Sequence, residues 1–535
     1  MHSNVTPLPP AIKPPLRHKV FLVLWSAGLA SSIGIWMQVI GAAWLMTTLT
    51  SSPLMVALVQ TAATLPAFLF GLPGGVLADI VDRRRLLLAT LAWMAATVGA
   101  LCLLTMADAL TPWTVLLLTG AIGAASALQA PAWQSAPAEI LPRAILPEAL
   151  ALLSMSGNGA RALGPALAGV FIAGFGTASV FAATAACFVL SLVAVSRVRF
   201  PSRRASDLPP ERLLGGMQSG IRYIRHSPIL RGQILRVFAS ITCAGAVFAL
   251  LPVIAKNQLA LDAGGYGLLT ACMGGGAVMG AILIGRLQRR FDDEAMVIAA
   301  ILLFAASTLC VAYIHVTTVA AVALVIAGFC WLAMGALPNA AVQTALPAWV
   351  RARGVALFLL AFQASQAIGA VLWGWMANHI GASHTLAVTA LLLVSTLLYS
   401  RHHPLRMGSE ADVTPSMHWA EPMVAVEPDP EDGPVAVEVG YQISPELRAE
   451  FVQAAYALSI IRMRDGAISW RLYRDLSEPT RYVERFVVDS WIEYQRQRIR
   501  ATLADQLTEE HMQRFHLGTD PPRMLHFIME PQPAG

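Results

Sequence analysis

The sequence predicts an all-α membrane protein that carries a small α+β domain at its C-terminal end. Of its 535 residues, 56% are hydrophobic and only 13% are charged, whereas soluble domains average about 25% charged residues. Twelve stretches are apolar over roughly the 20 residues that a helix needs to cross a bilayer. In lipid, such stretches must be helices, because an isolated strand would leave its backbone groups unpaired. We therefore expect twelve transmembrane helices in two six-helix bundles.

The expected spans cover residues 20–46, 54–77, 86–107, 113–135, 149–174, 177–196, 233–255, 265–287, 295–315, 319–345, 355–379 and 383–400. The first run is too long for the core of a cleavable signal, so the Pro-rich and basic segment before it is expected to be a cytoplasmic arm. The expected domains are that arm (1–19), a first bundle (20–196), a cytoplasmic loop (197–232), a second bundle (233–404), a linker (405–434) and a soluble domain (435–535). The loop is predicted to hold an amphipathic surface helix, with a plain linker as the alternative.

Positive charges mark alternate loops of the membrane part. One set of loops carries Arg83, Arg84, Arg85, Arg143, the arginines between residues 197 and 236, Arg286, Arg289, Arg290, Arg351 and Arg353. In the other set, Lys256 is the only lysine or arginine. The positive-inside rule places the first set in the cytoplasm, and twelve spans then place both termini there. Up to Arg406 the net charge is +14 and beyond it −9, which gives no reason to expect a nucleic-acid partner.

The membrane part also repeats itself with an offset of 205 residues. Leu141 and Pro142 recur as Leu346 and Pro347, Gly123 as Gly328, Gly164 as Gly369, and Gly169 as Gly374. The same offset relates Asn158 to Gln363 and Arg161 to Gln366. Two related halves are typical of secondary transporters.

Arg161 lies near the middle of a long apolar stretch, with Gly164 and Pro165 close behind it. A charge at that depth costs a few kcal/mol unless it faces protein or water. Asn158 shares its helix face, and Gln363 and Gln366 are expected to face the pair from the other half. A central substrate cavity is predicted from these four residues together with Gln38. Interhelical hydrogen bonding is the alternative.

Three tryptophans, Trp36, Trp133 and Trp373, are candidates either for stacking on a substrate or for packing.

Several motifs carry a family resemblance. The segment GGVLADIVDRRRLLL resembles the loop between spans two and three of the major facilitator superfamily, through Gly75, Leu77, Ala78, Asp79, Arg83 and Arg84, whereas Ile80 and Asp82 differ from that pattern. The segment GARALGPALAG, with Gly159, Gly164, Pro165 and Gly169, resembles the fifth-span motif of its antiporters. The segment SSIGIWMQ is similar to the first span of the bacterial enterobactin-exporter-like, or transmembrane secretion effector, branch.

The resemblance implies a proton-coupled exporter in the bacterial inner membrane. It also implies a conformational latch at Gly75, Asp79, Arg83, Arg84 and Arg85 that stabilises the outward-facing state. Each expected span lacks Asp and Glu at mid-depth, although proton coupling usually needs such a group. The candidates for the proton carrier are therefore Asp79 and Glu139, at cytoplasmic ends. An anionic or oxygen-rich substrate, such as a catecholate siderophore, is the hypothesis for what neutralises Arg161.

The residues after about 434 show the order β-α-β-β-α-β, which predicts a ferredoxin-like domain. Ser444 is expected to cap its first helix, and a second helix is expected from Ser490 to about Leu507. The domain resembles the antibiotic-biosynthesis-monooxygenase type, which often dimerises through its sheet. Trp491, His511, His516 and His526 show no ligand or triad spacing, so dimerisation or regulation is favoured over catalysis.

Three functions remain open from the sequence. The leading one is alternating-access export of small amphipathic molecules such as a siderophore, a macrolide or another drug. The alternatives are an importer of the same fold and a membrane-tethered enzyme that acts through the soluble domain. The sequence contains no phosphate-binding loop, no dinucleotide fingerprint and no metal-ligand cluster, so we expect no cofactor and no metal. The expected partners are a small-molecule substrate, the lipid bilayer and, through the soluble domain, a second copy of the chain.

Overall fold

The computed structural model describes residues 14–142, 145–198, 221–419, 422, 424–518 and 520–530. The chain divides into two compact units. The first unit comprises Met1–Leu208, Arg236–Ala336 and Leu360–His402, and the second comprises Pro209–Leu235, Leu337–Leu359 and His403–Gly535.

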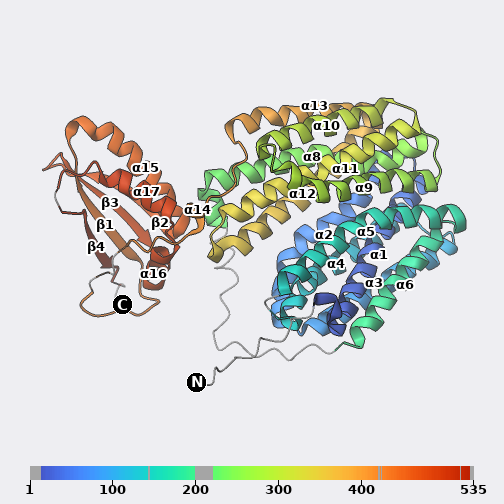
Figure 1. Cartoon of the computed structure of the whole chain (residues 1–535), viewed down its shortest axis with the longest axis horizontal. Coiled ribbons are helices and arrows are strands. Elements are labelled where there is room, and N and C mark those ends of the chain that lie inside the picture. The colour runs from blue at the N-terminus through green and yellow to red at the C-terminus, as the bar shows by residue number, and fades with distance from the viewer. Residues whose placement is uncertain are drawn as a thin grey trace, which may run out of the picture. The chain divides into compact units, whose positions relative to one another are not determined.

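Long apolar helices make up the first unit (Figure 1). They are α1 (Lys19–Leu49), α2 (Pro53–Ile80), α3 (Arg83–Met106), α4 (Pro112–Ile140), α5 (Leu146–Phe175), α6 (Thr177–Ser196), α8 (Pro228–Asn257), α9 (Ala263–Leu287), α10 (Asp293–Tyr313), α11 (Thr317–Ala345), α12 (Ala348–Ile380) and α13 (Ala382–His402). The beginnings of α8 and α12 and the end of α11 belong to the second unit. Within the described residues, eleven helices are long and apolar enough to cross a membrane. They match every expected span except the fifth, whose residues form the 30-residue helix α5.

Many of these helices begin with a capping polar side chain or a proline, just before an apolar run of the sequence. The Asp82 carboxylate accepts a hydrogen bond from the backbone N–H of Arg85, and the Asp262 carboxylate accepts one from Gly265. Thr111 caps α4 in the same way, ahead of a proline in its first turn. Such caps satisfy N–H groups that a helix cannot pair internally. Asp82, which differs from the family pattern, therefore defines the beginning of α3.

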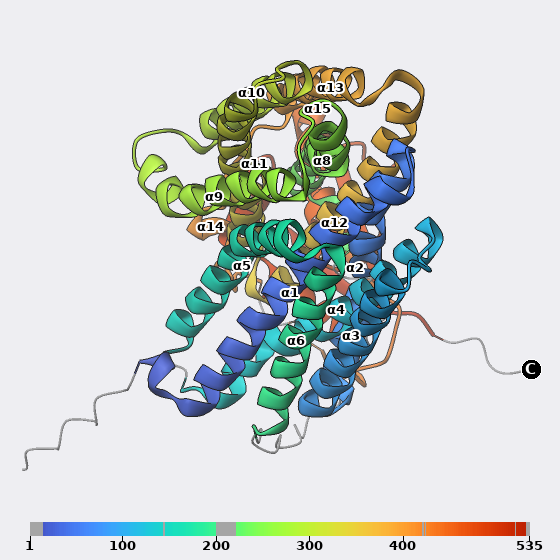
Figure 2. The same ribbon diagram turned by 90° about the vertical axis from the view of Figure 1, so that its right-hand side faces the viewer.

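The helices gather into two groups that follow chain order. Helices α1 to α6, coloured blue to teal in Figure 1, pack on one another, and α8 to α13, coloured green to orange, lie together. Figure 2 shows α5 of the first group beside α9 of the second, and these two helices share one of the most extensive contacts in the chain.

The glycines of the internal repeat occupy equivalent places in the two groups. A Cβ atom at Gly164 would lie 2.5 Å from Cβ of Trp36 on α1, and one at Gly369 would lie 2.7 Å from the carbonyl oxygen of Thr242 on α8. Each glycine therefore lets a helix pack closely on the first helix of its own group.

A second pair of repeat glycines joins the two groups. A Cβ atom at Gly169 would lie 2.8 Å from Cα of Gly267 on α9, and one at Gly374 would lie 2.6 Å from Cβ of Ala57 on α2. Each glycine therefore contacts the second helix of the opposite group. This reciprocal arrangement is what a twofold relationship between the halves requires.

The second unit contains a four-stranded antiparallel sheet with the order β2-β3-β1-β4. Its elements are β1 (Val435–Gln442), α15 (Arg448–Asp465), β2 (Ala467–Arg474), β3 (Arg481–Val488), α16 (Trp491–Arg500), α17 (Leu503–Gln513) and β4 (Arg523–Ile528), preceded by the short helix α14 (Glu410–Val413). Helices α15 and α17 cover one face of the sheet (Figure 1), and the core between them is built from aromatic and branched side chains.

Two local predictions for this domain need correction. The helix expected from Ser490 to about Leu507 is two helices, because Thr502 starts a new one: its hydroxyl accepts from the N–H of Asp505, whose carboxylate accepts from the N–H of Thr502. This reciprocal capping box favours a helix start at that point. Ser444 makes no side-chain cap, because a short 3-10 turn at Pro445–Leu447 precedes α15.

Part of the expected linker packs on the domain. The backbone of Ser416 donates to the carbonyl of Ala501. The Trp419 ring is 9% exposed and joins the core of the domain. Its indole N–H donates to the Glu509 carboxylate at 3.0 Å. In the expected cytoplasmic loop, residues 221–226 are helical, and residues 199–220, which include the first part of the predicted amphipathic helix, lie outside the described residues.

A buried ion cluster lies beneath the sheet. The Arg462 guanidinium is 2% exposed and contacts the carboxylates of Glu484 and Glu509 at 3.1 and 3.2 Å. Burial by itself would raise the pKa of Glu509. The charge of Arg462 and hydrogen bonds from His418 and Trp419 outweigh burial and hold that pKa at about 2. In the folded domain, Glu509 therefore remains ionised at pH values well below the ordinary pKa of a glutamate.

Candidate functional site

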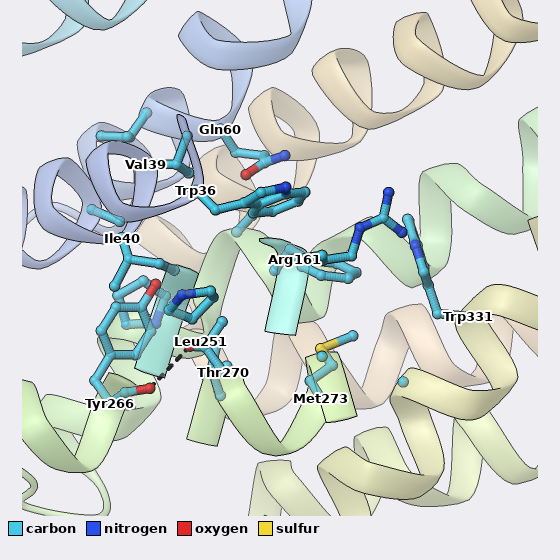
Figure 3. A pocket seen from close by; sticks show the side chains of 18 of the residues that line it. Trp36, Val39, Ile40, Gln60, Arg161, Leu251, Tyr266, Thr270, Met273 and Trp331 are labelled. Atoms are coloured by element: carbon cyan, nitrogen blue, oxygen red, sulfur yellow. Dashed lines mark hydrogen bonds between the residues drawn. The ribbon is translucent and has the colours of Figure 1, made fainter. Parts of the chain in front are cut away.

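A cavity lies between the two groups of helices in the first unit (Figure 3). Helices α1, α2 and α5 line it from the first group, and α8, α9 and α11 line it from the second. Its volume is about 40 Å³, which leaves room for about three water molecules. In this conformation, the cavity is therefore too small for a drug-sized molecule, and such a molecule could enter only if the helix groups moved.

Arg161 reaches into this cavity from α5. It is the only charged side chain among the described residues that line the cavity. Its guanidinium carbon lies 5.3 Å from the centre of the Trp36 ring, and Figure 3 shows it between Trp36 and Trp331. Its buried Nε atom has no hydrogen-bond partner among the described residues. A cation in this setting has N–H groups to offer an anionic or oxygen-bearing ligand, which would offset its desolvation.

Aromatic side chains form much of the remaining wall. Phe248 and Trp331 meet edge to face with ring centres 4.5 Å apart. Tyr266 stacks on Trp44 at 5.8 Å with an interplanar angle of 19°. Apolar walls with a few polar groups are typical of small-molecule sites. The cavity therefore offers flat apolar surface around one cation.

The structure brings only part of the predicted cavity set to this site. Gln38 is 1% exposed and lies inside the first group, where its amide donates to the Thr119 hydroxyl at 3.0 Å. Gln366 donates to Gln363 at 3.3 Å, and neither glutamine lines the cavity. In this conformation, these three polar side chains make hydrogen bonds within or between helices, and the substrate-cavity role expected for them stays a prediction. The side chain of Asn158 lies outside the described residues.

Other residues at the site were missed from the sequence. Gln60 on α2 and Thr270 on α9 line the cavity, although neither belongs to a motif. Gln60 carries a signal, because it is a lone amide within an apolar span. Of the three predicted tryptophans, Trp36 lines this cavity. Trp373 packs instead, with its indole N–H donating to Thr242 at 2.6 Å.

The ends of α1, α2, α8 and α12 close the cavity on one side. The Ser52 hydroxyl donates to the Asn378 side chain at 3.0 Å and so joins α2 to α12. The ammonium of Lys256 on α8 donates to the Thr47 carbonyl in the last turn of α1. A cation there also meets the negative end of the helix dipole. We call this side the Ser52 end.

At the opposite end, the predicted latch arginines contact carbonyl groups within the first helix group. Arg83 donates to the Ser135 carbonyl at 3.4 Å, and Arg84 donates to the Ser196 carbonyl. The backbone N–H of Arg85 meets the Asp82 cap. A Cβ atom at Gly75 would have no described neighbour within 4 Å. The side chains of Asp79 and Glu139 lie outside the described residues.

A buried ion pair in the second group was not predicted. Arg236 on α8 is 1% exposed and contacts Glu294, in the first turn of α10, at 2.5 Å. The sequence places Glu294 in an Asp-Asp-Glu cluster at a loop, which gave no sign of a buried partner 58 residues away.

Residues 11–534 match the profile of the transmembrane secretion effector family. The chain belongs to this family. The family lies within the major facilitator superfamily, whose members are transporters rather than enzymes. The chain is therefore a multi-pass membrane transporter of small molecules.

Two relatives agree with this assignment. The chain is 25% identical over 389 residues to the multidrug efflux pump Tap of Mycolicibacterium fortuitum. The matched region covers 70% of this chain and 93% of the pump. It is 26% identical over 274 residues to the enterobactin exporter EntS of Citrobacter koseri. The matched region covers 50% of this chain and 64% of the exporter.

Two solved transporters show a similar fold. A bacterial homologue of the human lysosomal transporter Spinster, inward-facing and unoccupied, matches with a TM-score of 0.59 at 15% identity, over 75% of this chain and all of that one. The nucleoside transporter NupG matches with a TM-score of 0.60 at 12% identity, over 71% of this chain and 98% of that one.

Proposed function

We propose that this transporter exports small amphipathic molecules from the bacterial cytoplasm by alternating access. The observation that carries the proposal is the Arg161 cavity between two helix groups whose contacts are reciprocal. Its relatives include a multidrug efflux pump and an enterobactin exporter. The cavity is too small for such cargo in this conformation, so cargo binding requires the two groups to part at one end.

The proposed topology has twelve spans, with α5 as the fifth. The arginine-rich connections, including Arg83 to Arg85, lie in the cytoplasm under the positive-inside rule. Both termini are then cytoplasmic, and the Ser52 end faces outward in the bacterial inner membrane. The proposed domain boundaries are those expected from the sequence, with residues 414–419 assigned to the soluble domain.

In this orientation, the structure represents a state closed to the outside. Lys256 with Thr47, and Ser52 with Asn378, join the two helix groups at the outer end. The Gly169–Gly267 contact lies on the same side. The proposed latch would form in the opposite, outward-facing state. In this structure, Arg83 and Arg84 contact carbonyls of their own group.

The proposed cargo carries an anionic or oxygen-rich group on an aromatic or apolar body. Arg161 would bind that group through its unpartnered Nε, and the rings of Trp36, Phe248 and Trp331 would contact the body. Charge-assisted hydrogen bonds are roughly twice as strong as neutral ones. Loss of the guanidinium should therefore reduce transport of anionic cargo far more than transport of neutral cargo.

Proton coupling is proposed for Asp79 or Glu139, as the superfamily resemblance implies. Coupling needs a group that titrates and is reached from each side in turn.

Export from cells that express the protein tests the function. A panel of siderophores and antibiotics would be measured with and without a proton uncoupler, in the wild type, Arg161→Gln and Arg161→Lys. We expect export that the uncoupler stops. Export of the anionic compounds should fall most in Arg161→Gln and least in Arg161→Lys. Export that is unchanged in both variants would contradict the role of Arg161, and accumulation in place of export would contradict the direction.

The soluble domain is proposed to have a ferredoxin-like fold and to regulate transport. Within the second unit, the Arg500 guanidinium carbon lies 4.3 Å from the centre of the Trp349 ring on α12. Tyr223 meets the same ring edge to face at 5.5 Å, and Arg222 contacts Glu493 at 3.0 Å. These contacts join the domain to the beginning of α12.

Two variants test this regulatory role. Trp349→Leu removes the ring that Arg500 and Tyr223 share, and deletion after residue 404 removes the domain. We expect both to change the export rate without abolishing export. Unchanged export rates in both variants would contradict regulation. An enzymatic activity that the full chain has and the deletion variant lacks would favour a tethered enzyme. Dimerisation through the open sheet face, where Phe527 is 48% exposed, is the second proposed role, and the mass of the purified protein in detergent tests it.

A further inference from the structure

A second cavity lies entirely within the first helix group. It has a volume of about 230 Å³ and is lined by α1, α4 and α5. Ser31 and Ser32 face it from α1, Gln129 and Trp133 from α4, and Ser156 from α5. We call this cavity the vestibule. Nothing in the transport mechanism above uses it.

The vestibule differs in chemistry from the Arg161 cavity. Half of the described residues that line it are serines or glutamines, and none of them carries a charge. Ser31 is 2% exposed, and its hydroxyl has no hydrogen-bond partner among the described residues. Gln129 is 3% exposed; among the described residues, its amide oxygen accepts a long hydrogen bond of 3.4 Å from Thr90, and its amide N–H donates to the sulfur of Met94, which is a weak acceptor. Buried polar groups with missing or weak partners are costly, so these two have hydrogen-bonding capacity left for a ligand.

Trp133 supplies a flat surface on the same wall. Its ring lies against α1 at Gly28, where an added Cβ atom would be 3.6 Å from the ring. The side chain is partly exposed and lines the vestibule. A tryptophan ring beside neutral hydroxyl and amide groups suits a sugar or another polyol. The ring can contact the C–H face of such a group while the polar side chains bond its hydroxyls.

The vestibule and the Arg161 cavity share two helices. On α1, Ser31 precedes Trp36 by five residues, and on α5, Ser156 precedes Arg161 by five. A helix rises about 1.5 Å per residue, so each step is about 7.5 Å. From the Arg161 cavity to the vestibule, both steps lead away from the Ser52 end. The two cavities are therefore about 7.5 Å apart along both helices and lie on different faces of each.

We propose that the vestibule is a second binding site, which takes the neutral, hydroxyl-bearing part of a cargo molecule. Ser31 and Gln129 bond its hydroxyl groups, and Trp133 contacts its ring face. The proposal rests on the proposed export function only for its place on the pathway; binding itself can be measured without transport. The competing interpretation is that the serines and glutamines only join helices.

Two fluorescent probes with one aromatic body separate the sites. 4-Methylumbelliferyl glucoside carries a neutral sugar, and 4-methylumbelliferyl sulfate carries an anion. Binding of each to the full chain in lipid nanodiscs would be measured by equilibrium dialysis. Ser31→Ala removes one hydrogen-bonding group, which should weaken glucoside binding about three- to tenfold, and Trp133→Leu should weaken it by a similar factor. Neither variant should change sulfate binding by more than about twofold.

Ser26→Ala is the matched control. Ser26 lies on the same helix, outside the vestibule, and its hydroxyl donates to the Val23 carbonyl at 3.0 Å. Wild-type protein that does not bind the glucoside, or Ser31→Ala and Trp133→Leu variants that bind it as tightly as Ser26→Ala does, would overturn the proposal. Arg161→Gln distinguishes the two hypotheses. If Arg161→Gln leaves sulfate binding unchanged, the proposed role of Arg161 fails. The vestibule proposal depends only on the binding of the glucoside. Equal thermal midpoints for all variants confirm that they are folded.

Discussion

Replacing Gly267 by alanine should weaken the contact that closes the Ser52 end. A Cβ atom there would lie 2.4 Å from Cα of Gly169 and 3.0 Å from the Pro165 carbonyl oxygen. Non-bonded carbon atoms rest at about 3.5–4.0 Å. Because both neighbours are backbone atoms, side-chain rotation cannot relieve the overlap. Helices α5 and α9 must then separate by roughly 1 Å or more.

The size of the effect follows from the cost of overpacking. An added methyl group in a tightly packed contact costs about 1–3 kcal/mol. That cost falls on the state in which α5 and α9 touch, and it is relieved when the helices part. The equilibrium should therefore shift toward the state open at the Ser52 end by a factor of about 5 to 150.

Disulfide trapping at the Ser52 end measures this shift. Ser52→Cys and Asn378→Cys would be introduced where the native side chains are 3.0 Å apart, in a background without the six native cysteines. Cross-linking should slow markedly when Gly267→Ala is added. The control is Gly174→Ala on α5, where a Cβ atom would have no described neighbour within 4 Å. If Gly267→Ala and Gly174→Ala cross-link at the same rate, the contact does not govern closure.

Three further predictions follow from other contacts. Lys256→Met should slow the same cross-linking by up to about fivefold, since a charge at a helix end contributes up to about 1 kcal/mol, whereas Lys256→Arg should not. Arg236→Met should lower the thermal midpoint of the purified chain, because it leaves Glu294, which is 18% exposed, without this partner; the cost should be below the value of about 3–5 kcal/mol that is typical of a fully buried pair, and an unchanged midpoint would contradict it. Because the pKa of Glu509 falls from 4.5 to about 2 on folding, its contribution to the stability of the soluble domain should be complete above pH 4.5 and lost as pH falls toward 2. Acid unfolding of the domain, followed by near-ultraviolet circular dichroism, should lose this component of its pH dependence in Glu509→Gln.

The sequence predicted the spans and the repeat well because both depend on properties that single residues carry. An apolar run long enough to cross lipid has few structural choices. A glycine that recurs at a fixed offset indicates the same close approach in both halves, as Gly164 and Gly369 show. The capping box at Thr502 and Asp505 was equally visible, and reading it would have divided the last helical segment correctly.

The cavity residues were harder to predict because helix rotation depends on neighbours. Gln38 and Gln60 are both lone amides in apolar helices. The Thr119 hydroxyl, 81 residues along the chain, bonds Gln38 inside the first group, whereas Gln60 lines the cavity. The repeat leaves the same question open. Arg161 and Gln366 correspond in sequence, yet Gln366 pairs with Gln363 on its own helix.

Transport by purified protein in proteoliposomes tests the central claim most directly. The cargo would be 4-methylumbelliferyl sulfate, and the proteins would be the wild type, Arg161→Lys, Arg161→Gln and the Ser26→Ala control. We expect saturable transport by the wild type and the control, reduced transport with Arg161→Lys, and at least a tenfold loss with Arg161→Gln, about the effect of 1.4 kcal/mol. Transport of the sulfate by Arg161→Gln at the wild-type rate would contradict a cargo site built around this cation.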